Sequence, residues 1–203
     1  MHRLATVPGQ DDGEAPGQLF VEQAPAPVVL LSSADTDLVA IEALLQAQPG
    51  LLPLELRALN LAALSHPAVI DHYIRTSLGA AQVVIVRLLG GRGHWSYGLE
   101  QLRLWADRPA NGGKRPRQLL VLAGTAEEDT NLASLGTVPT ALALALAAAL
   151  REGGAANLEA LLVCGAALLR GEIPEPPPLR LAADPLPHDW QADPGPRVGL
   201  IVY

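Results

Sequence analysis

The side chains best suited to binding a ligand lie in two short polar segments, and each segment follows a run of Val, Ile and Leu. Residues 32–37 read SSADTD, and residues 90–97 read GGRGHWSY. Hydroxyls and free N–H groups at the start of a helix can hold an anion, and the guanidinium of Arg92 can grip a carboxylate through two parallel hydrogen bonds. Both segments are therefore candidates for contact with an acidic ligand, but neither contains a complete active site.

In residues 32–37, capping of a helix competes with ligand contact. Ser32, Ser33 and Asp35 are candidate ligand-binding residues. Two aspartates in one turn oppose a strongly negative ligand, whereas carboxylates in the first turn stabilise a helix by about 0.3–1 kcal/mol. Capping by Ser33 or Asp35 is therefore the simpler interpretation, and contact with a ligand is the alternative.

In residues 90–97, three glycines permit positive φ and close approach of another group to the backbone. Ser96 stands where a dinucleotide-binding fingerprint requires its last glycine, so the segment is not that motif. Trp95 and Tyr97 could stack on a ligand or could pack the next helix beside Trp105, and both alternatives stay open. The candidate ligand-binding residues of this segment are Gly91, Arg92, Trp95 and Tyr97.

Arg87 is a further candidate, because it lies inside a run of apolar residues. A charge next to a sheet core needs a partner, and the nearest ones are the aspartates of residues 32–37. The sequence has no P-loop, no G-x-S-x-G or S-x-x-K motif, and no zinc-binding spacing among its five histidines. We therefore expect no catalytic residue, no metal ligand and no bound cofactor in this segment.

The elements that position these residues follow a repeating pattern: a short apolar run, turn residues, then apolar residues at helical spacing. This pattern predicts an α/β fold, a doubly wound, flavodoxin-like sheet of about four parallel strands in the order 2-1-3-4 with helices on both faces. The reversal of strand order then brings residues 32–37 and 90–97 together beyond the carboxyl ends of the strands. The predicted strands are residues 28–31, 54–59, 82–89 and 118–122. The predicted helices start at Ser33 or Asp35 and at 65–67, and cover 99–107, 140–152 and 157–170, with Asn157 as a cap and Gly171 as a stop.

The composition changes after Gly171, because eight of the 18 prolines fall between Pro174 and Pro196. A stretch so rich in proline predicts a linker and not regular structure. The final residues RVGLIVY predict a buried strand, either the start of a further domain or an edge strand of the same sheet. The expected organisation is an N-terminal segment (1–27), an α/β domain (28–171), a proline-rich linker (172–196) and the start of a following domain (197–203).

The net charge of −7 argues against a nucleic-acid partner, which would require a clustered basic surface. One basic cluster does exist; it has no aromatic residues within it, and we interpret it as a solvated loop. It comprises Arg108, Lys114, Arg115 and Arg117.

Cys164 is the only cysteine, so an internal disulfide is impossible, and its apolar neighbours predict a buried thiol. The N-terminus lacks the apolar core of a signal peptide, and the most apolar run, residues 140–150, is well short of the ~20 residues of a membrane span. We expect a cytoplasmic protein without contact with a membrane.

Three segments resemble the N-terminal region of the cobaltochelatase large subunit, CobN, a relative of the magnesium chelatase large subunit. They are residues 31–37 (LSSADTD), 64–67 (LSHP) and 87–102 (RLLGGRGHWSYGLEQL). Weaker similarity in residues 131–139 and 196–203 extends the resemblance over essentially the whole chain. His94 departs from the family, whose members more often carry an aromatic residue there.

The resemblance implies a part in the ATP-dependent insertion of Co²⁺ into hydrogenobyrinic acid a,c-diamide, during aerobic cobalamin synthesis. It further implies a complex that uses ATP and Mg²⁺ through AAA+ and integrin-I-like partner subunits, while the large subunit binds the corrinoid. Family members continue well beyond residue 203, so we expect a fragment whose metal-insertion residues lie in the remainder of the large subunit. The alternative is a stand-alone α/β module that binds a small acid or a tetrapyrrole without catalysis.

Overall fold

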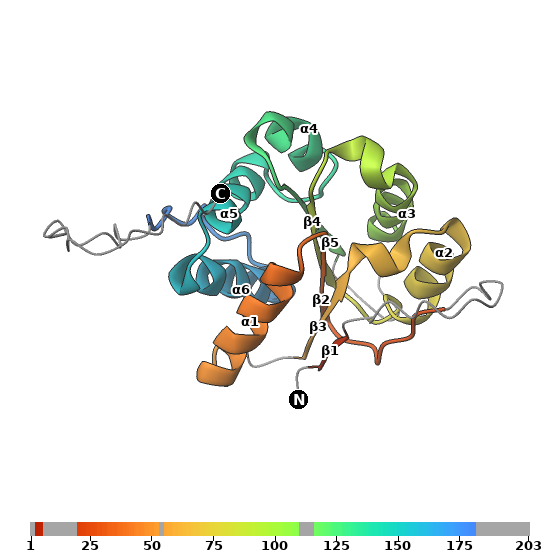
Figure 1. Cartoon of the computed structure of the whole chain (residues 1–203), viewed down its shortest axis with the longest axis horizontal. Coiled ribbons are helices and arrows are strands. Elements are labelled where there is room, and N and C mark those ends of the chain that lie inside the picture. Colours follow the sequence, from red (N-terminus) through yellow and green to blue (C-terminus); the bar gives the residue numbers. More distant parts are fainter. Residues whose placement is uncertain (1–2, 6–19, 53–54, 110–115, 182–203) are drawn as a thin grey trace, which may run out of the picture.

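The computed structural model describes residues 3–5, 20–52, 55–109 and 116–181, and shows a twisted sheet between two layers of helices (Figure 1). The sheet has five parallel strands in the order β1-β3-β2-β4-β5. The strands are β1 (Arg3–Ala5), β2 (Val28–Ser32), β3 (Leu56–Asn60), β4 (Val83–Leu88) and β5 (Gln118–Ala123).

The four predicted strands and their order are confirmed, and β1 is an addition that the sequence did not reveal. In this part of the sheet, β3-β2-β4-β5 is the predicted order 2-1-3-4. Strand β1 extends the sheet beyond β3, with Arg3 opposite Arg57. Three residues are too few to show a periodic pattern of their own, so only pairing with β3 defines this strand.

Two helical layers cover the sheet. In Figure 1, α1, α5 and α6 lie on one face and α2 and α3 on the other. The α-helices are α1 (Asp35–Ala47), α2 (Pro67–Thr76), α3 (Ser96–Ala106), α4 (Asp129–Ala133), α5 (Thr140–Glu152) and α6 (Ala155–Arg170). Short 3₁₀ helices precede α2, α3 and α4, namely η1 (Leu61–Leu64), η2 (Arg92–Trp95) and η3 (Ala126–Glu128).

Alternate residues of each central strand enter the two halves of the core. Val28 and Leu30 face α1, α5 and α6, whereas Val29 and Leu31 face α2 and α3. All four are at most 2% exposed, which explains the uninterrupted apolar run in the sequence. Because both faces are covered, the strands can place polar side chains in contact with water only near their ends.

The boundaries of α5 agree with the prediction, but the start of α6 does not. Asn157 is not a cap; it lies inside the helix and is 1% exposed. Its amide donates to the carbonyls of Gly153 and Arg180 (both 2.7 Å) and accepts from Arg180 N (3.0 Å). Asn157 therefore holds residues near 180 against the start of α6. Gly171, at φ +82°, ends α6 as predicted.

Residues 172–181, the described part of the predicted linker, form neither helix nor strand. Its continuation to residue 196 and the predicted strand at 197–203 lie outside the described residues. Cys164 is buried as predicted, and burial raises the pKa of its thiol. No described helix has the length and apolar character needed to cross a membrane.

The interpretation of the basic cluster as a solvated loop is wrong for Arg117, which is 7% exposed. Its guanidinium lies over the ring of Trp105, 4.7 Å from the centroid, and donates to two backbone carbonyls. The pattern of charges did not reveal this contact, because it depends on the packing of α3 against the start of β5. Lys114 and Arg115 are outside the described residues.

The packing of Trp95 on α3 predicts the effect of Gly98→Ala. A Cβ at residue 98 would lie 2.2 Å from the Trp95 ring. Overpacking costs about 1–3 kcal/mol, more than the ~0.5–1 kcal/mol that alanine contributes over glycine in a helix. We therefore expect Gly98→Ala to have a lower free energy of unfolding than the unaltered chain, measured by urea denaturation. The control is Gly93→Ala, where a Cβ would meet no atom within 4 Å; equal stability of the two variants would contradict this packing.

Candidate functional site

The carboxyl ends of β2 and β4 meet at the point where the strand order reverses. From β2 the chain crosses to β3 on one side, and from β3 it crosses back to β4 on the other. In open α/β sheets this is the usual position of a ligand site. Ser32, the last residue of β2, is opposite Arg87 in β4 and Asn60 in β3. The structure thus brings the two polar segments of the sequence together at the end of the sheet where the strands finish, as predicted. We call this end of the sheet the rim.

A buried polar cluster of Ser32, Asp37 and Arg87 lies at the rim. Asp37 is 7% exposed and forms an ion pair with Arg87 Nη1. Its second carboxylate oxygen accepts a hydrogen bond from Ser32 Oγ (2.5 Å), which in turn accepts from Ala34 N (3.0 Å). The predicted pairing of Arg87 with a rim aspartate is confirmed, and this pairing connects α1 to both central strands.

The predicted N-cap of α1, Ser33 or Asp35, is wrong, although Asp35 and Asp37 do lie in the first turn of the helix as expected. The N-cap residue is Ala34, and it provides no side-chain hydrogen bond. Ser33 N donates to the carbonyl of Arg87 (3.0 Å), and Asp35 accepts from the side chain of Asn60 (2.6 Å). Both residues therefore tie loops of the rim together, since bonds to neighbouring strands compete with local capping.

The glycines of residues 90–97 allow side chains of the chain itself to approach the backbone. Gly90 and Gly91 have φ of +87° and +75°, as predicted, whereas Gly93 does not have positive φ. The imidazole of His94 lies over Gly90, where a Cβ would be 2.6 Å from it, and the Glu128 carboxylate lies 3.0 Å from a Cβ at Gly91. Any larger residue at either position would displace these groups.

Trp95 and Tyr97 pack against the neighbouring elements. Trp95 is 8% exposed, and its indole N–H donates to the carbonyl of Leu64 (2.8 Å). The Tyr97 hydroxyl donates to the Asp71 carboxylate (2.9 and 3.0 Å), which joins α3 to α2 and raises the pKa of Tyr97. In this arrangement the two aromatic residues seat α3, which was the second of the two alternatives drawn from the sequence.

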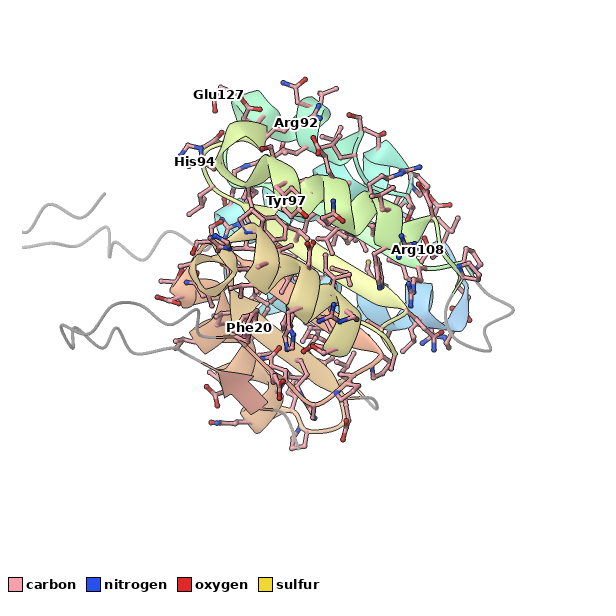
Figure 2. All side chains as sticks on the ribbon, turned by 90° about the vertical axis from the view of Figure 1, so that its right-hand side faces the viewer. Phe20, Arg92, His94, Tyr97, Arg108 and Glu127 are labelled. Atoms are coloured by element: carbon pink, nitrogen blue, oxygen red, sulfur yellow. The ribbon has the colours of Figure 1, made fainter. Side chains whose placement is uncertain are left out.

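Arg92 remains on the surface. It is exposed, and among the described residues no carboxylate pairs with it, neither Glu100 nor a rim aspartate. Its side chain borders a hollow of about 310 Å³ whose other walls include Leu99, Leu104 and Leu135. Figure 2 shows Arg92 and His94 at the rim end of α3, with Glu127 nearby. Arg92 is therefore the candidate residue best placed to meet a carboxylate from outside.

A second ion pair at the rim was not anticipated from the sequence. Arg151 of α5 binds both carboxylate oxygens of Asp129 (2.7 and 2.8 Å), and its Nη1 also lies 3.3 Å from the carbonyl of Ala123, the last residue of β5. The two residues are 22 positions apart, so neither helical nor strand periodicity predicts the pair. Across the described ranges, no three Asp, Glu, His or Cys side chains are grouped so as to hold a metal ion.

Comparison with known proteins points to one kind of protein. A protein of Pseudomonas aeruginosa described as "Aerobic cobaltochelatase subunit CobN" is 34% identical over 220 residues, which cover all of this chain and 17% of that relative. A protein of Sinorhizobium sp with the same description is 34% identical over 179 residues, covering 87% of this chain and 13% of the relative. The chain thus spans less than a fifth of the length of these relatives. No protein-family model matches it.

Among solved structures, the "Catalytic Subunit of Cobaltochelatase from Mycobacterium tuberculosis" has a similar fold, with a TM-score of 0.50 at 24% identity. The similarity covers 73% of this chain and 11% of that subunit. At this identity the likeness supports the fold alone.

The buried ion pair predicts the effect of Arg87→Met. Removing one partner of such a pair leaves the other charge buried, which costs about 3–5 kcal/mol, whereas replacing both partners by apolar residues costs much less. In urea unfolding, we expect Arg87→Met to be far less stable than the double variant Arg87→Met/Asp37→Leu. The control is Arg170→Met, which removes the exposed pair with Glu172, worth about 0–1 kcal/mol. Additive effects at positions 37 and 87 would contradict the coupling.

Proposed function

Since this chain belongs to the CobN family of cobaltochelatase subunits, we propose that it supplies the N-terminal α/β domain of a cobaltochelatase large subunit. The observation that carries this proposal is the identity of 34% along the whole chain. The fraction of the relatives that it spans, 17%, supports a role as one part of a longer subunit.

The proposed reaction of the whole enzyme is the ATP-dependent insertion of Co²⁺ into the corrin ring of hydrogenobyrinic acid a,c-diamide. AAA+ and integrin-I-like subunits supply ATP hydrolysis with Mg²⁺, and the large subunit holds the corrinoid in the cytoplasm. Co²⁺ is a substrate of this reaction, and we assign its binding to the remainder of the large subunit.

The proposed role of this domain is to position groups, not to carry out the bond-forming step of metal insertion. Its rim side chains bond to one another, as in the cluster of Ser32, Asp37 and Arg87 and the pair of Asp129 and Arg151. These contacts tie α1, α4 and α5 to the strand ends beside the loop that carries Arg92 and His94. A corrinoid presents carboxylates and amides at its periphery, and a guanidinium held on a fixed loop can pair with such a carboxylate in fork geometry.

A chelatase assay tests the proposed function. The full-length subunit that contains this sequence, mixed with its partner subunits, ATP, Mg²⁺, Co²⁺ and hydrogenobyrinic acid a,c-diamide, is expected to form the cobalt corrinoid, measured by its absorbance spectrum. The isolated 203-residue chain is expected neither to insert cobalt nor to hydrolyse ATP. Insertion by the isolated chain would refute the assignment of chemistry to the remainder. A downstream reading frame without chelatase sequence would instead favour the stand-alone module.

Arg92→Ala in the full-length subunit tests contact with the corrinoid. An exposed charge pair contributes about 0–1 kcal/mol, so we expect the dissociation constant to rise by up to about fivefold. Because Arg92 has no ion-pair partner among the described residues, the melting temperature is expected to stay unchanged. The control is Arg170→Ala, at the end of α6. Unchanged affinity together with a lower melting temperature would assign Arg92 to the structure.

A further inference from the structure

A second polar site lies at the other end of the sheet, where the strands begin. Between the C-terminal parts of α2 and α3, close to the start of β5, is a cleft of about 400 Å³. Arg108 marks it in Figure 2, at the end of α3 remote from Arg92 and His94. The side chains that line the cleft include Arg75, Gln101, Leu104, Trp105, Arg108 and Arg117.

The buried wall of the cleft carries a positive charge that no described carboxylate neutralises. Arg117 is 7% exposed, and its hydrogen bonds go to the carbonyls of Trp105 (3.1 Å) and Gly79 (2.9 Å). Carbonyls satisfy N–H groups but bring no net charge. Within the described part of the chain, Arg117 Nε has no hydrogen-bond partner. Burial, and to a lesser extent the positive charge of Arg108, lower the pKa of Arg117.

The outer wall adds two exposed guanidiniums. No ion pair joins Arg108 to a carboxylate among the described residues, and the side chain of Arg75 contacts the imidazole of His72 at 3.4 Å. Asp71, one turn before Arg75, also lines the cleft, but its carboxylate accepts the hydrogen bonds of Tyr97. Three guanidiniums and one carboxylate, that of Asp71, therefore line the cleft. This local excess of positive charge occurs in a chain whose net charge is −7.

We propose that this cleft binds a small organic polycarboxylate. Arg75 and Arg108 pair with its carboxylates, the Gln101 amide donates to a further oxygen, and Leu104, which is 49% exposed, covers its hydrocarbon frame. Arg117, stacked on Trp105, supplies the fixed positive charge behind them. A volume of 400 Å³ lies within the range of small-molecule sites.

The apolar part of the lining argues for an organic acid over an inorganic anion. Leu104 and Ile74 offer no hydrogen bond, and a bare phosphate would leave their exposed surface in water. The proposal does not depend on the chelatase assignment, because this chain alone forms the cleft. Its guanidiniums lie at the end of α3 opposite Arg92, although Leu104 lines both the cleft and the hollow beside Arg92.

Titration of the 203-residue chain with tricarballylate, a compact tricarboxylate, tests the proposal by calorimetry. We expect saturable binding at one site, and a dissociation constant at least about tenfold higher for Arg75→Gln/Arg108→Gln, since two charge-assisted contacts are lost. The melting temperature of that variant without ligand is expected to match the unaltered chain, because neither side chain has a carboxylate partner among the described residues. The matched control is Arg103→Gln/Arg170→Gln, which removes two exposed arginines that are ion-paired elsewhere.

Inorganic phosphate at equal ionic strength provides the second arm, and we expect it to bind at least about tenfold more weakly than tricarballylate. Absence of saturable binding would overturn the proposal. Equal binding by the Arg75/Arg108 double variant, or equal weakening by the Arg103/Arg170 control, would show that attraction to the general surface charge explains the effect. Phosphate binding as tight as that of tricarballylate would overturn the assignment to an organic acid.

Discussion

Helices cover both faces of the sheet, and this constraint determines where polar chemistry can occur. Residues of β2 and β4 are almost completely buried, so a charged side chain on a central strand is tolerated only near a strand end and only with partners. Arg87 satisfies both conditions: it is the penultimate residue of β4 and pairs with Asp37. The ion pair joins the start of α1 to the central strands, and the Ser32 hydroxyl completes it.

The same constraint separates two ends of the sheet that differ in electrostatic character. At the rim, two guanidiniums are paired with carboxylates, Arg87 with Asp37 and Arg151 with Asp129, while Arg92 stays exposed without a described carboxylate partner. At the opposite end of the sheet, the hydrogen bonds of Arg117 go to carbonyls, so its charge is not balanced by a described carboxylate. Matched charges hold loops in place, whereas an excess of one sign attracts a ligand of the other sign. The rim therefore fits the positioning role proposed within the chelatase, and the cleft beside α2 and α3 fits a separate acid-binding role.

Among the described residues, buried aromatic side chains occur in only one of the two helical layers. Trp95 directly precedes α3 and Trp105 belongs to it. Each donates its indole N–H to a carbonyl close to one end of α2, that of Leu64 and that of Leu78 respectively. The buried face of α1, α5 and α6 is built chiefly from Leu and Ala, with Ile41 and Cys164. The α2–α3 layer consequently owes more to specific hydrogen bonds, and it also carries the hollow beside Arg92 and the cleft beside Arg108.

From the sequence alone, the fold class, the order of four strands and the pairing of Arg87 with a rim aspartate could be predicted, because burial on both faces leaves uninterrupted apolar runs and a buried charge needs a partner. The resemblance of residues 87–102 to CobN was also present in the sequence. The roles of Asn157, Trp95 and Arg117 were decided only by tertiary structure. Each depends on groups from distant parts of the chain, such as Arg180, Leu64 and Gly79. Local spacing carries no record of such contacts, since they arise only when the helices pack on the sheet.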